Sequence, residues 1–152
     1  MDVQTAGGNE IDFGFERLNI HGKTARLELT VLWPDTVLIG KPAMQANQAF
    51  FTAKVRSRSQ RIASALIAAD ASRAEDVDLF STHVLVGWEG VYDRQKKPVP
   101  FSVGAARALL RQLPDHVFDL IRGFFANPDS FLDPADADAG AAKDIAGKST
   151  AG

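Results

Sequence analysis

The sequence contains no cysteine. Disulfide bonds, thiolate metal sites and cysteine nucleophiles are therefore excluded for this chain. Long apolar runs are missing too, because charged residues or glycine interrupt every run well before the ~18 to 20 residues that a membrane span needs. The first ten residues are polar and glycine-bearing, unlike a signal peptide. We therefore expect a soluble cytoplasmic protein that has no membrane partner.

An excess of charge of one sign is also lacking. The formal net charge is only -2 over 152 residues, which argues against binding to nucleic acid through bulk charge. The hydrophobic content of 45% is enough for one domain with a core. We predict a flexible N-terminus over 1–10, a single globular domain over 11–132 and a disordered tail over 133–152. The tail is rich in alanine, aspartate and glycine and cannot form a core.

Residue patterns typical of catalysis are scarce. The three histidines, His21, His83 and His116, include no pair at the i, i+4 spacing that holds a metal on a helix. A nucleophile elbow and an EF-hand loop are both missing. Residues 142–149 match a loose phosphate-loop pattern, but only three residues follow them, whereas the mechanism needs a helix there. We expect no enzymatic activity, no metal and no cofactor.

The N-terminal third has the period of β-structure. Apolar and polar residues alternate from Ile11 to Phe15 and again from Leu27 to Trp33, which predicts two strands with one buried face each. Gly22 between them suits a tight reversal, so we predict an antiparallel hairpin within 11–39. Residues 37–39 are a candidate for a short third strand.

Helical periodicity begins near Ala43 and predicts a helical region over 43–132. A stripe at helical spacing predicts one long helix to Ala69, with an apolar face formed by Phe51, Val55, Ile62, Leu66 and Ala69. The other faces carry the only strong charge patch of the chain: Lys54, Arg56, Arg58 and Arg61. Three interpretations of this patch are open: a solvent-exposed helix face, a binding site for an acidic protein, or a contact with the phosphates of a nucleic acid. We favour the first two, because no nucleic-acid-binding motif accompanies the patch.

A second helical stripe leads to a tryptophan. It contains Val77, Phe80, Val84, Trp88 and Val91. A strand over 84–86 is the competing interpretation, because these residues are partly β-branched and Gly87 weakens a helix. We favour the helix, since the stripe spans four turns, and we expect Trp88 to be a core anchor.

The last third predicts a turn and two helices. Residues 92–97 form a polar turn, and the prolines that follow favour extended backbone. Ser102 is placed to cap one helix and Pro114 to begin another. Phe124 and Phe125 cannot both point inward on a thin helix, so one of them is a candidate apolar contact for a partner. The whole pattern predicts an α+β fold, mostly α, in which an N-terminal hairpin or small antiparallel sheet packs on about four helices.

One stretch carries a family resemblance. A valine-rich segment ending in Trp-x-Gly-Val is followed by a polar turn, a Val-Pro-Phe-Ser segment and a helix rich in alanine and leucine. The motif residues are Trp88, Gly90, Val91, Pro98, Pro100 and Phe101. With the hairpin and the basic helix before it, this arrangement resembles the tail assembly chaperones of long-tailed, siphophage-type bacteriophages and related prophages. The resemblance covers about Ile11 to Phe131.

The resemblance implies a role in phage tail assembly. Such chaperones bind the tape measure protein and keep it soluble while tail tube subunits polymerise around it. The resemblance implies the tape measure protein as the main partner, the tail tube protein as a second partner, and self-association. It also implies that the protein is located in the bacterial host cytoplasm and is absent from the mature virion. A long helix with an exposed apolar stripe needs such masking.

Other classes of function stay open at this point. One is a structural phage tail or connector component, which would be present in purified particles. Another is a nucleic-acid-binding module that uses the basic helix 54–61, whose binding would depend steeply on salt. A third is a phosphate-loop enzyme that depends on Lys148 and Ser149.

Overall fold

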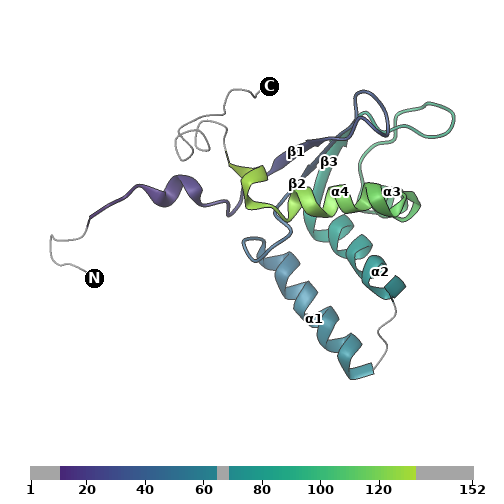
Figure 1. Ribbon diagram of the computed structural model, residues 1–152. Helices are drawn as coiled ribbons and strands as arrows, with labels where there is room; N and C mark the ends of the chain where they lie inside the picture. The colour runs from purple at the N-terminus through teal and green to yellow at the C-terminus, as the bar shows by residue number, and fades with distance from the viewer. Residues whose placement is uncertain (1–10, 65–68, 133–152) are drawn as a thin grey trace. The chain divides into compact units, whose positions relative to one another are not determined.

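The computed structural model describes residues 11–64 and 69–132, with the side chains of 61–71 excluded (Figure 1). The described residues divide into two compact units. One comprises Ile20–Phe131 and contains the sheet and the four α-helices of the described chain; the other contains residues up to Asn19 together with Leu132. Three predictions concern residues outside the described ranges: the flexible N-terminus over 1–10, the disordered tail over 133–152 and the phosphate-loop pattern within that tail.

The predicted first strand is wrong. Residues 11–14 have no regular structure, and Phe15–Leu18 form a short 3-10 helix. Gly14 has a left-handed φ of 71°, and its N–H donates to Asp12 Oδ1 at 2.9 Å, which bends the chain into a turn. Ile11 and Phe13 are 71% and 68% exposed, so the alternating pattern has no buried face here.

The sheet has three antiparallel strands in the order β1-β2-β3: β1 Ala25–Glu28, β2 Val37–Gly40 and β3 Leu85–Glu89. The hairpin joins β1 to β2, the predicted second and third strands, and the Leu29 N–H donates to the Thr36 carbonyl at 2.9 Å beyond the last strand pair. The Leu32 N–H donates to the Leu29 carbonyl at 3.0 Å, so a turn replaces the second half of the predicted 27–33 strand.

The second helical stripe is a helix only in its first part. Helix α2 spans Ala69–Leu79 and widens into a π-helical turn, η2, over Phe80–Val84. From Leu85 onward the helix prediction is wrong, because β3 pairs with β2 and places Trp88 opposite Leu38. Free backbone groups at the edge of β2 supply hydrogen bonds to the segment, and its β-branched residues suit an extended chain.

Helix α1 spans Gln48–Ser64 and buries a different face from the predicted one. The Asn47 side chain accepts the Phe50 N–H at 3.3 Å and donates to the His83 carbonyl at 2.8 Å, which ties the start of α1 to η2. Phe50 is only 5% exposed, and its ring lies edge-on to Phe80 at 6.0 Å. Phe51 and Val55, from the predicted apolar stripe, are consequently turned toward solvent.

Two helices complete the core. Helix α3 spans Val103–Gln112, and α4 spans Asp115–Phe125, followed by the 3-10 turn Pro128–Phe131. The predicted cap is confirmed, since Ser102 Oγ accepts the Ala105 N–H at 3.0 Å. The apolar side chains with no exposure are Leu38, Val84, Ala106, Leu110, Phe118, Ile121 and Phe125. The predicted fold class, a small antiparallel sheet with about four helices, is confirmed.

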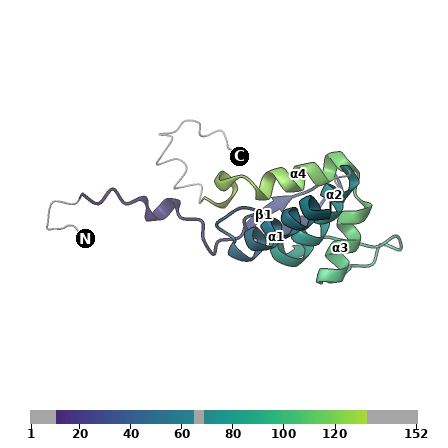
Figure 2. The same cartoon turned by 90° about the horizontal axis from the view of Figure 1, so that it is seen from below.

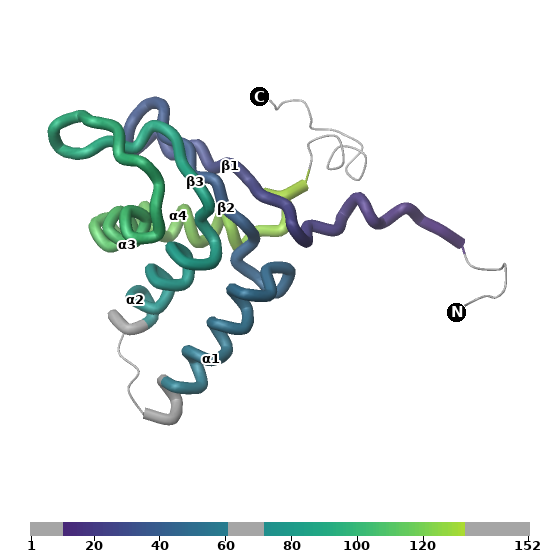
Figure 3. The backbone as a smooth tube through the Cα atoms, turned by 180° about the vertical axis from the view of Figure 1, so that it is seen from behind, coloured from purple at the N-terminus to yellow at the C-terminus, as the bar shows by residue number. Residues whose placement is uncertain are grey.

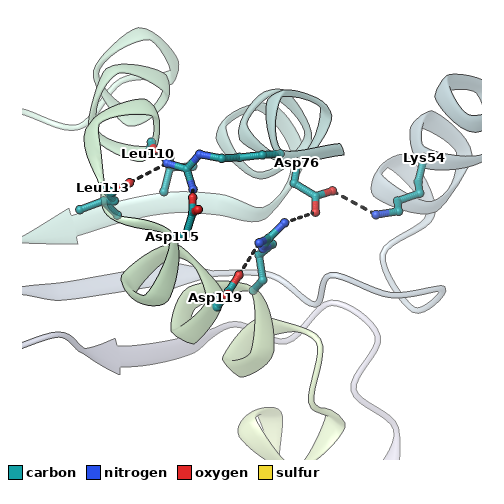
Figure 4. A network of polar contacts seen from close by, with 8 residues as sticks. Lys54, Asp76, Leu110, Leu113, Asp115 and Asp119 are labelled. Atoms are coloured by element: carbon teal, nitrogen blue, oxygen red, sulfur yellow. Dashed lines mark hydrogen bonds and ion pairs between the residues drawn. The ribbon is translucent and has the colours of Figure 1, made fainter. Parts of the chain in front are cut away.

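Ion pairs join the helices around one buried carboxylate. The side chain of Asp76 on α2 is 8% exposed, and its two oxygens contact Lys54 of α1 and Arg122 of α4 at 3.0 Å each. Figure 4 shows Lys54 pointing toward Asp76 from the neighbouring helix. Arg122 also pairs with Asp119 within α4. Because both cations reach the same carboxylate, this cluster holds three helices in one arrangement.

A second arginine secures the corner between α3 and α4. Arg73 of α2 donates to the carbonyls of Leu110 and Leu113 at 3.0 and 2.7 Å, and it pairs with Asp115 at 3.1 Å (Figure 4). Carbonyls at a helix C-terminus lack partners within the helix and favour a nearby positive charge. The corner that positions α3 against the sheet is therefore held from α2.

Candidate partner-binding site

An apolar cleft of about 470 Å³ opens between the end of the sheet, the turn over residues 92–98 and α3. We call it the aromatic groove. Its main lining residues are Trp33, Trp88, Tyr92, Val99, Ala108 and Leu109. Most of these side chains are half-buried, so their apolar surfaces remain open to solvent. Asp93, Arg94 and Gln112 place polar groups in the lining as well.

Trp88 is held in the groove from three sides. Its place on β3 sets it opposite the fully buried Leu38. The indole Nε1–H donates to the Val99 carbonyl at 2.8 Å, and the Phe101 ring stands edge-on to the indole at 5.2 Å. The polar atom of the indole is thus satisfied within the protein, so a partner would meet the apolar part of the ring.

Gly90 brings the hairpin loop against the end of β3. It has a φ of 65°, and a β-carbon at this position would lie 2.3 Å from the Asp35 carbonyl oxygen. The Thr36 hydroxyl donates to the Gly90 carbonyl at 2.7 Å. The loop and the turn after β3 consequently lie at the same end of the sheet (Figure 3), where Trp33 meets Tyr92 edge-on at 5.6 Å.

Tyr92 links the two loops that border the groove. Its hydroxyl donates to Asp35 Oδ2 at 2.5 Å. This hydrogen bond is the main cause of a raised pKa for the Tyr92 hydroxyl, with smaller contributions from desolvation and from the negative charge of Asp35. Tyr92 also forms a bridge with Pro98 across the turn, which Lys96 completes with a left-handed φ of 67°.

The structure brings the six motif residues together. A shallow cleft of about 220 Å³ is lined by Trp88, Gly90, Val91, Pro98, Pro100 and Phe101, together with Tyr92 and Val99. It shares Trp88, Val91, Tyr92 and Val99 with the aromatic groove. The expectation that Trp88 anchors the core from a helix is corrected, because the residue lies on a strand and is only half-buried. Of the six motif residues, Trp88 and Val91 line the aromatic groove itself.

A comparison of the sequence with protein families gives a match to the YdaY prophage protein family over residues 39–140. This range is more than half of the chain. The chain belongs to the YdaY prophage protein family. Comparisons with curated proteins and with solved structures gave no match. The matched range includes β3, the turn and α3 of the aromatic groove, whereas Trp33 precedes it.

The groove of this YdaY family member includes residues that sequence reasoning missed. Alternation along the sequence predicts a strand at Trp33, and no sequence pattern singles out Leu109 as a binding residue. Trp33 instead lies in the loop between β1 and β2, and Leu109 is half-buried. Spacing along the chain could not indicate this, because the contact of Trp33 with Tyr92 joins segments that are far apart in sequence.

The basic residues predicted for partner binding separate into different environments. Lys54 contacts Asp76, whereas Arg56 and Arg58 are exposed. The side chain of Arg61 lies outside the described residues. On α4, Phe125 is fully buried, so its prediction as a partner contact is corrected: it packs against Gly40, where a β-carbon would come within 2.8 Å of its ring. Phe124 is half-buried beside it.

Neither a metal site nor a membrane-spanning helix is found in the part of the chain that the structure describes. Within residues 11–64 and 69–132, no group of three or more histidine, aspartate and glutamate side chains has an arrangement that could hold a metal ion. Over the same ranges, no helix combines the length and apolar character needed to cross a lipid bilayer.

Proposed function

We propose that this YdaY prophage protein is a phage tail assembly chaperone whose aromatic groove binds an apolar-striped helix of the tape measure protein. The prophage family is established by the sequence match. The chaperone role is supported by the motif around Trp88 and by the groove that this motif helps to build.

The observation that carries the proposal is the chemistry of the groove. Trp33 and Trp88 present large, half-buried rings beside Leu109. Burying such surface against a partner yields about 25 cal/mol per Å², and aromatic side chains dominate the energy of most interfaces. Amphipathic helices commonly bind by inserting side chains from successive turns into a groove of this kind. One groove would mask a short stretch of a long helix, so many copies would be needed.

In this role the protein acts by binding and carries out no catalysis. It would keep the tape measure protein soluble in the bacterial host cytoplasm, promote tail tube polymerisation around it and leave before the virion is complete. The tail tube protein is a second proposed partner, and self-association along the tape measure would supply the many copies.

The test is co-expression with the long helical tape measure protein of the same prophage. We expect that protein to be soluble only in the presence of this chain, and the two to co-purify. Leu109→Asp places a charge in the groove and should abolish both effects. Leu120→Asp is the matched control, because Leu120 is a 56% exposed leucine on α4 outside the groove.

The two tryptophans of the chain both line the groove, so their fluorescence reports its occupancy directly. A blue shift on adding tape measure segments, absent in Leu109→Asp, would place the helix there. If the tape measure protein stays insoluble and nothing co-purifies, the chaperone proposal is wrong. Presence in purified particles would then indicate a structural tail component, and steeply salt-dependent DNA binding would indicate a nucleic-acid module.

A further inference from the structure

Helix α1 presents a second exposed apolar surface away from the groove. It packs against α2 (Figures 1 and 2) and against η2. It contributes no residue to the groove lining described above. Phe51 is 39% exposed and Val55 is 48% exposed, and their spacing of four residues puts them one above the other on the helix. We call this surface, together with Arg56 and Arg58, the α1 face.

The α1 face carries positive charge beside its apolar centre. Arg58 follows Phe51 by seven residues, about two helical turns, so it extends the line of the two apolar side chains. Arg56 lies about 100° around the helix from Val55, on the side away from Phe51. Both arginines are exposed, and neither has an ion pair with any residue that the structure describes. The sequence of α1, Gln48–Ser64, contains no acidic residue.

We propose that the α1 face binds an acidic amphipathic helix of a partner protein. Apolar side chains of that helix would cover Phe51 and Val55, and flanking carboxylates would pair with Arg56 and Arg58. Arginine suits such contacts because its guanidinium can bind a carboxylate through two hydrogen bonds. This is a second binding surface beyond the proposed function, so one copy could hold the groove's ligand and an acidic protein at the same time.

A protein partner fits this surface better than a nucleic acid does. The centre of the face joins the ring of Phe51 to the aliphatic side chain of Val55, which offers no surface on which a base could stack. Lys54, the remaining cation with a described side chain on α1, is already paired with Asp76 at 3.0 Å. Two arginines that have no ion pair with any described residue stand beside an apolar stripe, and they match a helix with hydrophobic positions flanked by acids.

The probe is a labelled synthetic peptide of about 20 residues, long enough to form a helix when bound. It carries leucines at helical spacing flanked by glutamates. A second peptide has lysine in place of every glutamate, and a third has the glutamate composition in scrambled order. Binding to the full-length chain is measured by fluorescence anisotropy at moderate salt. We expect the glutamate peptide to bind and the other two to bind at least about tenfold more weakly.

Variants of the chain then separate the apolar and the charged contributions. Phe51→Ser with Val55→Ser should weaken binding of the glutamate peptide by about tenfold or more. Arg56→Glu with Arg58→Glu should reverse the preference, so that the lysine peptide binds and the glutamate peptide does not. Leu120→Ser, in a 56% exposed leucine of α4, is the control and should bind as wild type does. Because all these positions are exposed, the variants should stay folded, which circular dichroism checks.

The inference is overturned if the glutamate and lysine peptides bind equally, or if the serine substitutions leave binding unchanged. It is also overturned if a single-stranded oligonucleotide displaces the peptide and binds more tightly, since that result assigns the face to nucleic acid. The assay contains no tape measure protein, and Leu109→Asp should bind the peptide normally. Failure here is therefore distinguishable from failure of the proposed chaperone role.

Discussion

Alanine at Gly90 should destabilise the protein through two separate costs. The first is conformational: an L-residue at a φ of 65° costs about 1 to 2 kcal/mol relative to glycine. The second is steric, because the new β-carbon would lie 2.3 Å from the Asp35 carbonyl oxygen, and backbone atoms cannot rotate away. The loop must move by roughly an ångström, which strains the packing by about 1 to 3 kcal/mol.

Moving that loop also threatens the hydrogen bond from Thr36 to the Gly90 carbonyl, worth about 1 kcal/mol. The total is about 3 to 6 kcal/mol, a large share of the ~5 to 15 kcal/mol that stabilises a typical domain. Two other glycines serve as controls. Gly22 has a φ of 80°, and a β-carbon added there would have no atom within 4 Å, so Gly22→Ala isolates the conformational cost. A β-carbon at Gly87 would meet its nearest atom at 3.8 Å without a positive φ, so Gly87→Ala should carry neither cost.

The assay is equilibrium urea unfolding followed by tryptophan fluorescence, which reports the groove because both tryptophans line it. We expect the free energy of unfolding to stay the same or rise slightly for Gly87→Ala, to decrease by about 1 to 2 kcal/mol for Gly22→Ala and to decrease most for Gly90→Ala. If Gly90→Ala and Gly22→Ala lose the same amount, the close approach of the two loops does not contribute, and the account of the groove's construction is refuted.

Two further predictions concern charged groups. Asp76→Asn should lower the free energy of unfolding, measured in urea, by about 2 to 3 kcal/mol. This is less than the loss of a fully buried ion pair would cost, because the side chains of Lys54 and Arg122 are 32% and 29% exposed and can regain water. A loss below ~0.5 kcal/mol would mean that the cluster does not hold the helices together. Tyr92 is the only tyrosine, so the ultraviolet absorbance of tyrosinate follows its titration alone. The pKa of Tyr92 is raised in the folded protein, so the hydrogen bond to Asp35 stabilises the fold fully at pH values below the ordinary pKa of tyrosine. This stabilisation is lost as the pH rises through the higher pKa of the folded state. Asp35→Asn should move the titration midpoint down, and an unchanged midpoint would show that this contact does not set the pKa.

Local features of the sequence predicted local structure well. Ser102 caps α3, and Pro114 directly precedes α4, because a cap or a helix start depends only on residues within one turn. The polar turn after Tyr92 and the strand at residues 37–39 were also found. The fold class followed from the change of period between the N-terminal third and the rest.

Periodicity was less informative where one pattern suits two structures. The stripe through Trp88 fits a helix, yet its last part pairs with β2 as a strand. The alternation from Ile11 to Phe15 fits a strand, yet the segment ends in a 3-10 helix with exposed side chains. In both cases the outcome depended on whether a strand with free hydrogen-bonding groups pairs with the segment, and spacing along the chain does not contain that information.

The sequence alone determined the absence of disulfides, the helix caps and breaks, the presence of a basic α1 and the motif that resembles tail assembly chaperones. Only the tertiary structure decided which faces are covered. It turned Phe51 and Val55 outward, buried Phe125 beneath Gly40 and assembled the aromatic groove from a hairpin loop, a strand end and a helix. The physical reason is that caps and turns depend on neighbours a few residues away, whereas burial depends on packing between distant segments, here Trp33 with Tyr92 and Phe50 with Phe80.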